Sequence, residues 1–127
     1  MALNKYTSNE YETNKIVFHN ESFTVSGISY YQDIVKNIDY NCELHMISEI
    51  NNPFDKEAIA IYYNECKIGY VPKNYKHKMK QYITNNNKMK IINIKKIRNN
   101  NKNIIGIRII HESLFETNMI NDSIFGD

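Results

Sequence analysis

The feature that most constrains the fold of this sequence is the position of its one clear amphipathic helix. Between residues 72 and 84, apolar side chains recur at i, i+4, i+7 and i+8: Tyr75, Met79, Tyr82 and Ile83. Pro72 suits the first turn of such a helix. Strand-like runs precede and follow it, whereas a doubly wound parallel sheet needs a helix after each strand. The order predicts a mainly β (α+β) fold, a small antiparallel, partly open β-barrel of about six strands with one main helix between strands 4 and 5.

The strand-like runs are short and are separated by turn-forming residues. They are KIVFH (15–19), SFTVSGISY (22–30), CELHMISEI (42–50), residues 58–63, residues 66–71, KMKIINIKKIR (88–98) and NIIGIRIIHE (103–112). Run 22–30 alternates as a half-buried strand does, and Gly27 inside it suggests a bulge or a close backbone approach. In run 42–50 the same period puts Leu44, Met46 and Ser48 on one face. The last two runs predict a long hairpin across residues 99–102, and residues 31–38 predict a short helical or irregular connection.

Length and composition predict a single domain. A chain of 127 residues buries roughly two thirds of its unfolded surface without needing a disulfide or a metal. We expect a polar, loose segment at 1–14, one domain at 15–112 and a tail at 113–127. The first residues lack the apolar core of a signal peptide, and no run approaches the ~18 apolar residues of a membrane span. We therefore expect a cytoplasmic protein without membrane contact.

Cysteine and histidine spacing predicts no metal and no cofactor. Cys42 and Cys66 form no C-x-x-C motif and lie in or beside strand-like runs. That is typical of buried, reduced thiols, and a disulfide or redox pair is the alternative. The four histidines show no metal-ligand spacing with each other or with the cysteines.

Charge is segregated along the chain although the net charge is only +2. Residues 67–108 hold twelve Lys or Arg and no acid, and the rest holds four basic residues and all fourteen acids, so the two parts carry +12 and −10. Such segregation can create a local potential that attracts a nucleic acid. A solvated lysine face, favoured by AT-rich coding, is the alternative interpretation.

Three sequence blocks resemble a known family. They are FTVSGISYY (23–31), EINNPFDKEAIAIY (49–62) and KIGYVPK (67–73). In order and spacing they are similar to the HIRAN domain pattern, which is G-x-x-Y-Y, then N-P-x-D-x-x-A-I, then I-G-Y/H-[VIL]-P/K. The resemblance covers about 22–84 firmly and the C-terminal hairpin loosely, and it suggests a stand-alone bacterial or phage-type member. It implies a modified OB-like barrel that binds single-stranded DNA, with a free 3′ end as the ligand of some members.

The resemblance also implies roles for individual residues. Tyr30 and Tyr31 match paired tyrosines that frame the terminal nucleotide, and Phe54 matches an aromatic that stacks on a base. Asp55 matches an acid that accepts a hydrogen bond from the terminal 3′-hydroxyl. Lys73 matches a lysine that contacts phosphate.

The chain also departs from the family pattern. Ser29 stands where members that grip DNA ends can carry an arginine, and Tyr70 stands where some carry a histidine. The hairpin tip RNNNKNI has no aromatic, although some members cover the last base with one from that hairpin. Asn52 in the N-P turn, and Lys76 and Lys80 on the helix face of Lys73, complete the candidate nucleic-acid-binding set.

Elementary chemistry agrees with these roles. Tyrosine and phenylalanine faces stack on any exposed base, at roughly 1 to 3 kcal/mol each. A carboxylate repels phosphate but accepts a hydroxyl, so an acid in a basic groove can discriminate a strand end from a continuing strand. The alternatives are local: Asn52 and Asp55 can cap the turn through the backbone. The paired tyrosines can be core, one on each face of a strand, and the helix lysines a solvated face.

Two functions from different classes follow. The first is a nucleic-acid-binding module for single-stranded DNA or DNA 3′ ends, with RNA not excluded. The second is a protein-interaction module, an adaptor or inhibitor of a DNA-processing protein. No G-x-S-x-G, P-loop or paired-acid metal motif is present, and Asp55 has only Glu57 as a neighbouring acid, so we expect no catalysis. Pathway and oligomeric state are left open.

Overall fold

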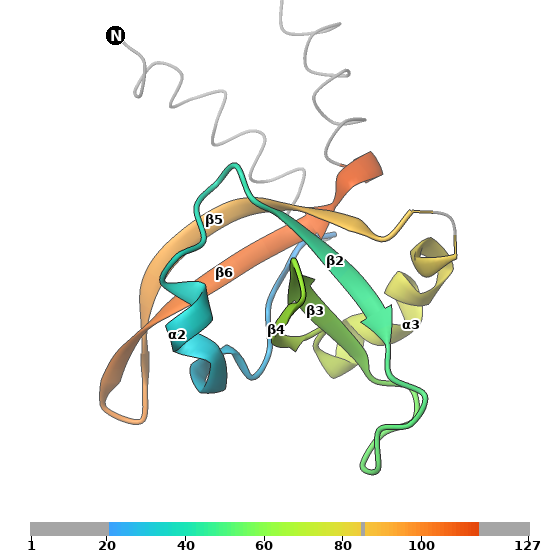
Figure 1. Cartoon of the computed structure of the whole chain (residues 1–127), viewed down its shortest axis with the longest axis horizontal. Helices are drawn as coiled ribbons and strands as arrows, with labels where there is room; N and C mark the ends of the chain where they lie inside the picture. Colours follow the sequence, from blue (N-terminus) through green and yellow to red (C-terminus); the bar gives the residue numbers. More distant parts are fainter. Residues whose placement is uncertain (1–20, 85, 115–127) are drawn as a thin grey trace, which may run out of the picture.

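The computed structural model describes residues 21–84 and 86–114, which form one curled antiparallel sheet in the order β1-β6-β5-β2-β3-β4 (Figure 1). Its elements are β1 (Phe23–Thr24), the 3-10 helix η1 (Ile28–Tyr31), α2 (Gln32–Val35), β2 (Glu43–Ser48), β3 (Ile59–Tyr63), β4 (Cys66–Tyr70), α3 (Lys73–Ile83), β5 (Lys88–Asn99) and β6 (Lys102–His111). The six strands, with α3 between the fourth and fifth, confirm the predicted mainly β, OB-like, partly open barrel.

The two ends of the sheet meet at one point. Ser26, just after β1, and Tyr70, at the end of β4, exchange two backbone hydrogen bonds of 2.8 Å each. Gly69 makes this approach possible, because a Cβ there would lie 2.5 Å from the Ser26 carbonyl oxygen and φ is 154°. The close backbone approach predicted for Gly27 is therefore found at Gly69 instead. Gly27 meets nothing within 4 Å, and its φ of 72° serves the turn into η1.

That turn overturns part of the predicted run 22–30. The strand ends at Thr24, and Tyr30 and Tyr31 lie in η1 rather than on opposite faces of a strand. In β2, Leu44 and Met46 are buried as predicted, whereas Ser48 is exposed because it lies at the strand's end beside the loop. The predicted strand 15–19 lies outside the described residues.

The core fills the barrel, and α3 closes one opening of it. Met79 on α3 is fully buried, and the Tyr75 ring lies 5.3 Å from that of Phe23 in β1. The predicted apolar stripe of α3 faces this core, since Tyr82 and Ile83 pack against it too. Most of the rest comes from strands: Leu44, Met46, Ile59, Ile61, Ile68, Met89, Ile107 and Ile109.

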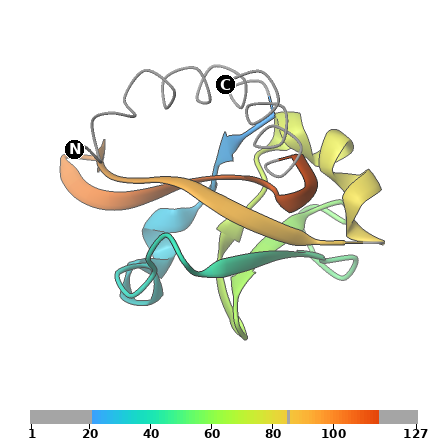
Figure 2. The ribbon, with the colours of Figure 1, turned by 90° about the horizontal axis from the view of Figure 1, so that it is seen from above.

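The predicted long hairpin is β5–β6, and its turn is tighter than expected. Only Asn100 and Asn101 form the loop, with φ of 53° and 65°. Asparagine tolerates this left-handed conformation, which two-residue hairpins need. The ribbon runs beyond its neighbours, because β2 pairs with β5 only over Lys88–Lys90. Its far end stands clear of β2, β3 and β4 in Figures 1 and 2, with α2 alongside.

Candidate nucleic-acid interface

The loop that joins β2 to β3, residues 49–57, is folded around Asn52. The Asn52 side-chain oxygen accepts hydrogen bonds from the backbone N–H groups of Phe54 (2.8 Å) and Asp55 (3.0 Å). Its amide nitrogen donates to the Glu49 carboxylate at 3.0 Å. These bonds hold the loop in its turn, so Asn52 acts as the turn-forming residue that an N-P sequence favours.

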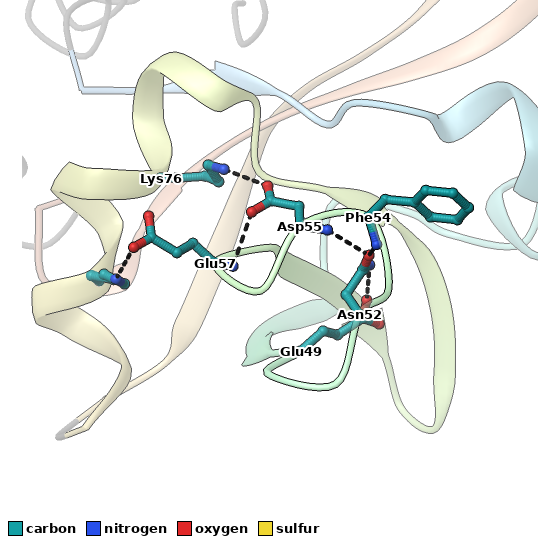
Figure 3. A network of polar contacts seen from close by, with 7 residues as sticks. Glu49, Asn52, Phe54, Asp55, Glu57 and Lys76 are labelled. Atoms are coloured by element: carbon teal, nitrogen blue, oxygen red, sulfur yellow. Dashed lines mark hydrogen bonds and ion pairs between the residues drawn. The ribbon is translucent and has the colours of Figure 1, made fainter.

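Asp55 has partners for both of its carboxylate oxygens. Oδ1 accepts the backbone N–H of Glu57 at 2.9 Å, and Oδ2 forms an ion pair with Lys76 of α3 (Figure 3). The hydrogen bond from Lys76, followed by that from Glu57, holds the pKa of the Asp55 carboxyl below its ordinary value. The side chain is still 33% exposed. Asp55 thus caps the turn and remains reachable from solvent.

Phe54 points the other way. Figure 3 shows its ring directed away from α3, while the Asp55 carboxylate points toward it. Phe54 is 95% exposed and Tyr30, in η1, is 86% exposed, the two highest values among the exposed large hydrophobic side chains of the described residues. Tyr31 instead packs against the core. Core packing, one of the alternatives weighed for the tyrosines, therefore describes Tyr31 and not Tyr30.

Tyr70 ties the closure of the barrel to the loop. Its hydroxyl donates to Glu49 at 2.9 Å and accepts from Lys67 at 2.9 Å, and Lys67 also pairs with Glu49. Burial opposes ionisation of Glu49, but the hydrogen bonds from Lys67, Asn52 and Tyr70 outweigh it, and the pKa of Glu49 lies below its ordinary value. The hydrogen bonds that Lys67 donates to Glu49 and Tyr70 raise the pKa of Lys67.

These contacts form one connected path through the candidate residues. Ser26 leads into η1 and is bonded to the Tyr70 backbone, the Tyr70 hydroxyl reaches Glu49, and Glu49 reaches Asn52. The structure therefore links η1, which carries Tyr30, to the loop that carries Phe54. Ser29 lies in η1 and is half-buried.

Two lysines of α3 lie against the 49–57 loop. Lys76 pairs with Asp55, and Lys80 lies 3.4 Å from the Glu57 carboxylate. Lys73 is exposed and close enough to lower the pKa of Asp55 through its charge, a smaller contribution than the hydrogen bonds to that carboxyl. Of the set predicted from sequence, direct contacts join Asn52, Asp55 and Lys76, Tyr70 reaches the loop through Glu49, and Tyr31 is turned toward the core.

Sequence reasoning missed two residues of this site, Glu49 and Lys67. Glu49 accepts bonds from Lys67, Tyr70 and Asn52 and so holds the loop. Both lie inside the recognised blocks, but a salt bridge across eighteen residues leaves no periodic trace in a sequence.

The described residues hold no group of three or more His, Cys, Asp or Glu side chains arranged to bind a metal ion. Both cysteines are free, but Cys66 is exposed rather than buried. Within residues 21–84 and 86–114, no helix is long and apolar enough to cross a membrane.

The structure is thus a small antiparallel barrel that leaves the rings of Phe54 and Tyr30 exposed. The model of the HIRAN domain family matches residues 18–112, and this chain belongs to that family. HIRAN domains are generally DNA-binding modules that recognise DNA ends, and the domain is not itself catalytic. No match was found among curated proteins or among solved structures.

Proposed function

We propose that this HIRAN domain binds single-stranded DNA at its 3′ end, with Phe54 and Tyr30 as stacking surfaces. The observation that carries the proposal is the exposure of these two rings, 95% and 86%, in the 49–57 loop and in η1, which other contacts hold in place. Exposed aromatic faces stack on bases of any sequence. Tyr31, beside Tyr30 but anchored in the core, would frame the terminal nucleotide from the side, and Ser29 would lie at the same edge.

Asp55 is proposed as the acceptor of the terminal 3′-hydroxyl. A carboxylate offers about four lone-pair positions, and the Glu57 N–H and Lys76 occupy one on each oxygen. The remaining positions can accept a hydroxyl. The turn-capping role and the sensing role are compatible, because the same contacts that cap the turn also fix the carboxylate's direction.

Lys73, Lys76 and Lys80 are proposed to contact phosphates. Lys73 forms no ion pair among the described residues. Lys76 and Lys80 already pair with carboxylates, so a phosphate would compete with Asp55 and Glu57 for them. Asn52 and Tyr70 would act by holding the loop. This arrangement would give moderate electrostatic attraction and leave much of the selectivity to the rings and the acid. The domain bounds 15–112, the cytoplasmic location and a stand-alone existence stay predictions.

The test is a fluorescence anisotropy titration with a short labelled single strand at several salt concentrations. Each neutralised phosphate adds about −0.7 to the log–log salt slope, so three to four contacts give roughly −2 to −3. Lys73→Gln should reduce the slope by about 0.7 without changing the melting temperature. An RNA of the same sequence, titrated in parallel, decides between DNA and RNA.

Absence of binding at low salt, or a slope near zero, would overturn the proposal. The protein-interaction module would then be the better description of this barrel.

A further inference from the structure

The outer part of the β5–β6 hairpin, residues 94–99 and 102–107, is named here the hairpin arm. Beyond Lys90, β5 has left β2, and β1 reaches β6 only near Arg108 and Ile109. The arm is therefore a two-stranded ribbon. Among the described residues its β5 edge has no neighbouring strand, and its β6 edge is met by the chain after β1 only at Ile107, whose C=O accepts from the Val25 N–H at 2.9 Å. An unpaired strand edge is a template for another strand.

Side chains show which backbone groups point outward. On the β6 edge, the Gln32 amide bonds both the N–H (2.8 Å) and the C=O (3.0 Å) of Ile105. On the β5 edge, the Tyr40 hydroxyl accepts from the Ile94 N–H at 2.8 Å and lies 3.5 Å from its C=O. Each side chain takes the place that one residue of a further strand would occupy.

The register then identifies the open positions on β5. Ile105 faces Lys96 across the ladder. Because the N–H and C=O of Ile105 point outward, Ile105 and Lys96 form a non-hydrogen-bonded pair of the ladder. The N–H and C=O of Lys96 therefore also point outward, on the opposite edge of the ribbon. The period of two gives Arg98 the same direction. Lys96 and Arg98 thus follow the Tyr40-capped Ile94 along the β5 edge, and neither has a backbone partner on that side within the described part of the chain.

The charged side chains of the arm are all cationic. The arm's exposed charged residues are Lys95, Lys96, Arg98 and Lys102. No acid occurs between residues 67 and 108. The ion pairs among the described residues involve Lys67, Lys76 and Lys80 and none of the arm.

We propose that the β5 edge from Lys95 to Asn99 receives an acidic, extended peptide segment of a partner protein as an added antiparallel or parallel strand. The open edge offers N–H donors and C=O acceptors in alternation, which a peptide backbone matches. A phosphodiester backbone carries acceptors only, so it leaves the carbonyls unmatched. The cations select acidic side chains, and Tyr40 marks the end of the docking site.

The experiment uses the whole chain, labelled with ¹⁵N, and a blocked nine-residue probe peptide that alternates glutamate with valine. We expect the peptide to shift the amide signals of Lys96 and Arg98 and to slow their hydrogen exchange. A peptide of the same pattern with lysine in place of glutamate should not bind. Lys96→Gln combined with Arg98→Gln should weaken binding of the glutamate peptide by about tenfold, roughly a few-fold for each charge.

A matched pair of variants separates backbone pairing from charge. Arg98→Ala and Arg98→Pro remove the same charge, but only proline removes the outward N–H, which the ladder with β6 does not use. Arg98→Pro should bind the glutamate peptide about fivefold more weakly than Arg98→Ala, the effect of one hydrogen bond. The amide signals of Ile97 and Asn99 report that the hairpin is intact in each variant, and Lys96→Pro against Lys96→Ala repeats the comparison if it is not.

Three results would overturn the proposal. Equal binding by the proline and alanine variants at both positions would mean that charge alone, without backbone pairing, holds the peptide. Absence of shifts at millimolar peptide would mean that the edge cations only keep other strands away. Shifts of the same amides with a single-stranded oligonucleotide, but not with the peptide, would make the arm a phosphate-contacting surface.

Discussion

The lysines beside the 49–57 loop and the cations of the hairpin arm belong to the same basic stretch of sequence but differ in their partners. Lys67, Lys76 and Lys80 each pair with an acid of the loop. The arm's four cations form no ion pair within the described residues. Acids from outside the stretch thus pair with three of its first five cations and, among the described residues, with none of the arm's four. The cations beside the loop have defined carboxylate partners, whereas the charges of the arm remain available to attract an acidic ligand.

The largest expected difference between the two regions concerns their glycines. Gly69→Ala, at the closure beside the loop, would place Cβ 2.5 Å from a backbone oxygen at a φ of 154°, and we expect a loss of about 2 to 4 kcal/mol in unfolding free energy. Gly106→Ala, in the arm, would place Cβ 2.9 Å from the flexible end of Ile97, and we expect a change within about 1 kcal/mol. Urea denaturation measures both, and equal losses would contradict this contrast.

The next effect concerns the exposed rings. Phe54→Ala or Tyr30→Ala should weaken binding of a single strand by about 1 to 3 kcal/mol without lowering the melting temperature, because neither ring belongs to the core. Ile50→Ala is the matched control, since Ile50 is 71% exposed in the same loop but has no planar face. Its affinity should equal that of the wild type. If a ring variant melts early in step with its loss of binding, stacking is not the cause.

A smaller effect tests the acid. The wild type should prefer a 3′-hydroxyl end over a 3′-phosphate end by about tenfold, since roughly 1.4 kcal/mol is one decade and a charge-assisted hydrogen bond contributes that much. Asp55→Asn should shrink the preference and leave binding to internal stretches unchanged or slightly stronger.

Glu57→Gln is the control for that experiment, because it removes a neighbouring charge that pairs only loosely with Lys80. It should keep the preference for the hydroxyl end. Equal binding of both ends by the wild type would leave Asp55 as a turn cap alone.

The smallest effect is the pH response. The folded pKa values of Glu49 and Asp55 lie below their ordinary 4.5 and 3.8, so the stability they contribute is present above those values and is lost as pH falls through the lower, folded ones. Hydrogen exchange at the amides of Phe54 and Asp55 should therefore speed up below about pH 4 relative to the arm, which contains no acid. An arm that loosens at the same pH would contradict the distinction.

Much of the fold was predictable because it follows local periods. The stripe of α3 and the β5–β6 hairpin show helical and strand repeats that a sequence displays directly. Tyr30 and Tyr31 were placed wrongly on a strand because run 22–30 keeps its alternation up to Gly27, where a positive φ turns the chain into η1. Alternation alone does not reveal where a strand ends.

The sequence predicted which residues the candidate site contains, but not which of them bond to one another. The motif indicated Asn52, Phe54 and Asp55, and the helix face indicated Lys76. The pairing of Asp55 with Lys76 joins residues 21 apart, and the closure at Gly69 depends on Ser26 far earlier in the chain. Such contacts arise from how the strands are arranged in space, which no local pattern records.

The pairing of β1 with β6 has a consequence for the order in which the chain acquires its shape. Phe23 of β1 lies opposite Ile109 of β6 in the register, so the first described strand can pair only after the last one has been made. By contrast, β2–β3–β4 and β5–β6 pair with close sequence neighbours. During synthesis from the N-terminus, β1 would stay unpaired until β6 has emerged from the ribosome. Protease resistance of ribosome-bound chains of increasing length should therefore rise in one late step, after Ile109 is exposed. A newly made molecule would hold its 49–57 loop before β1 joins the sheet.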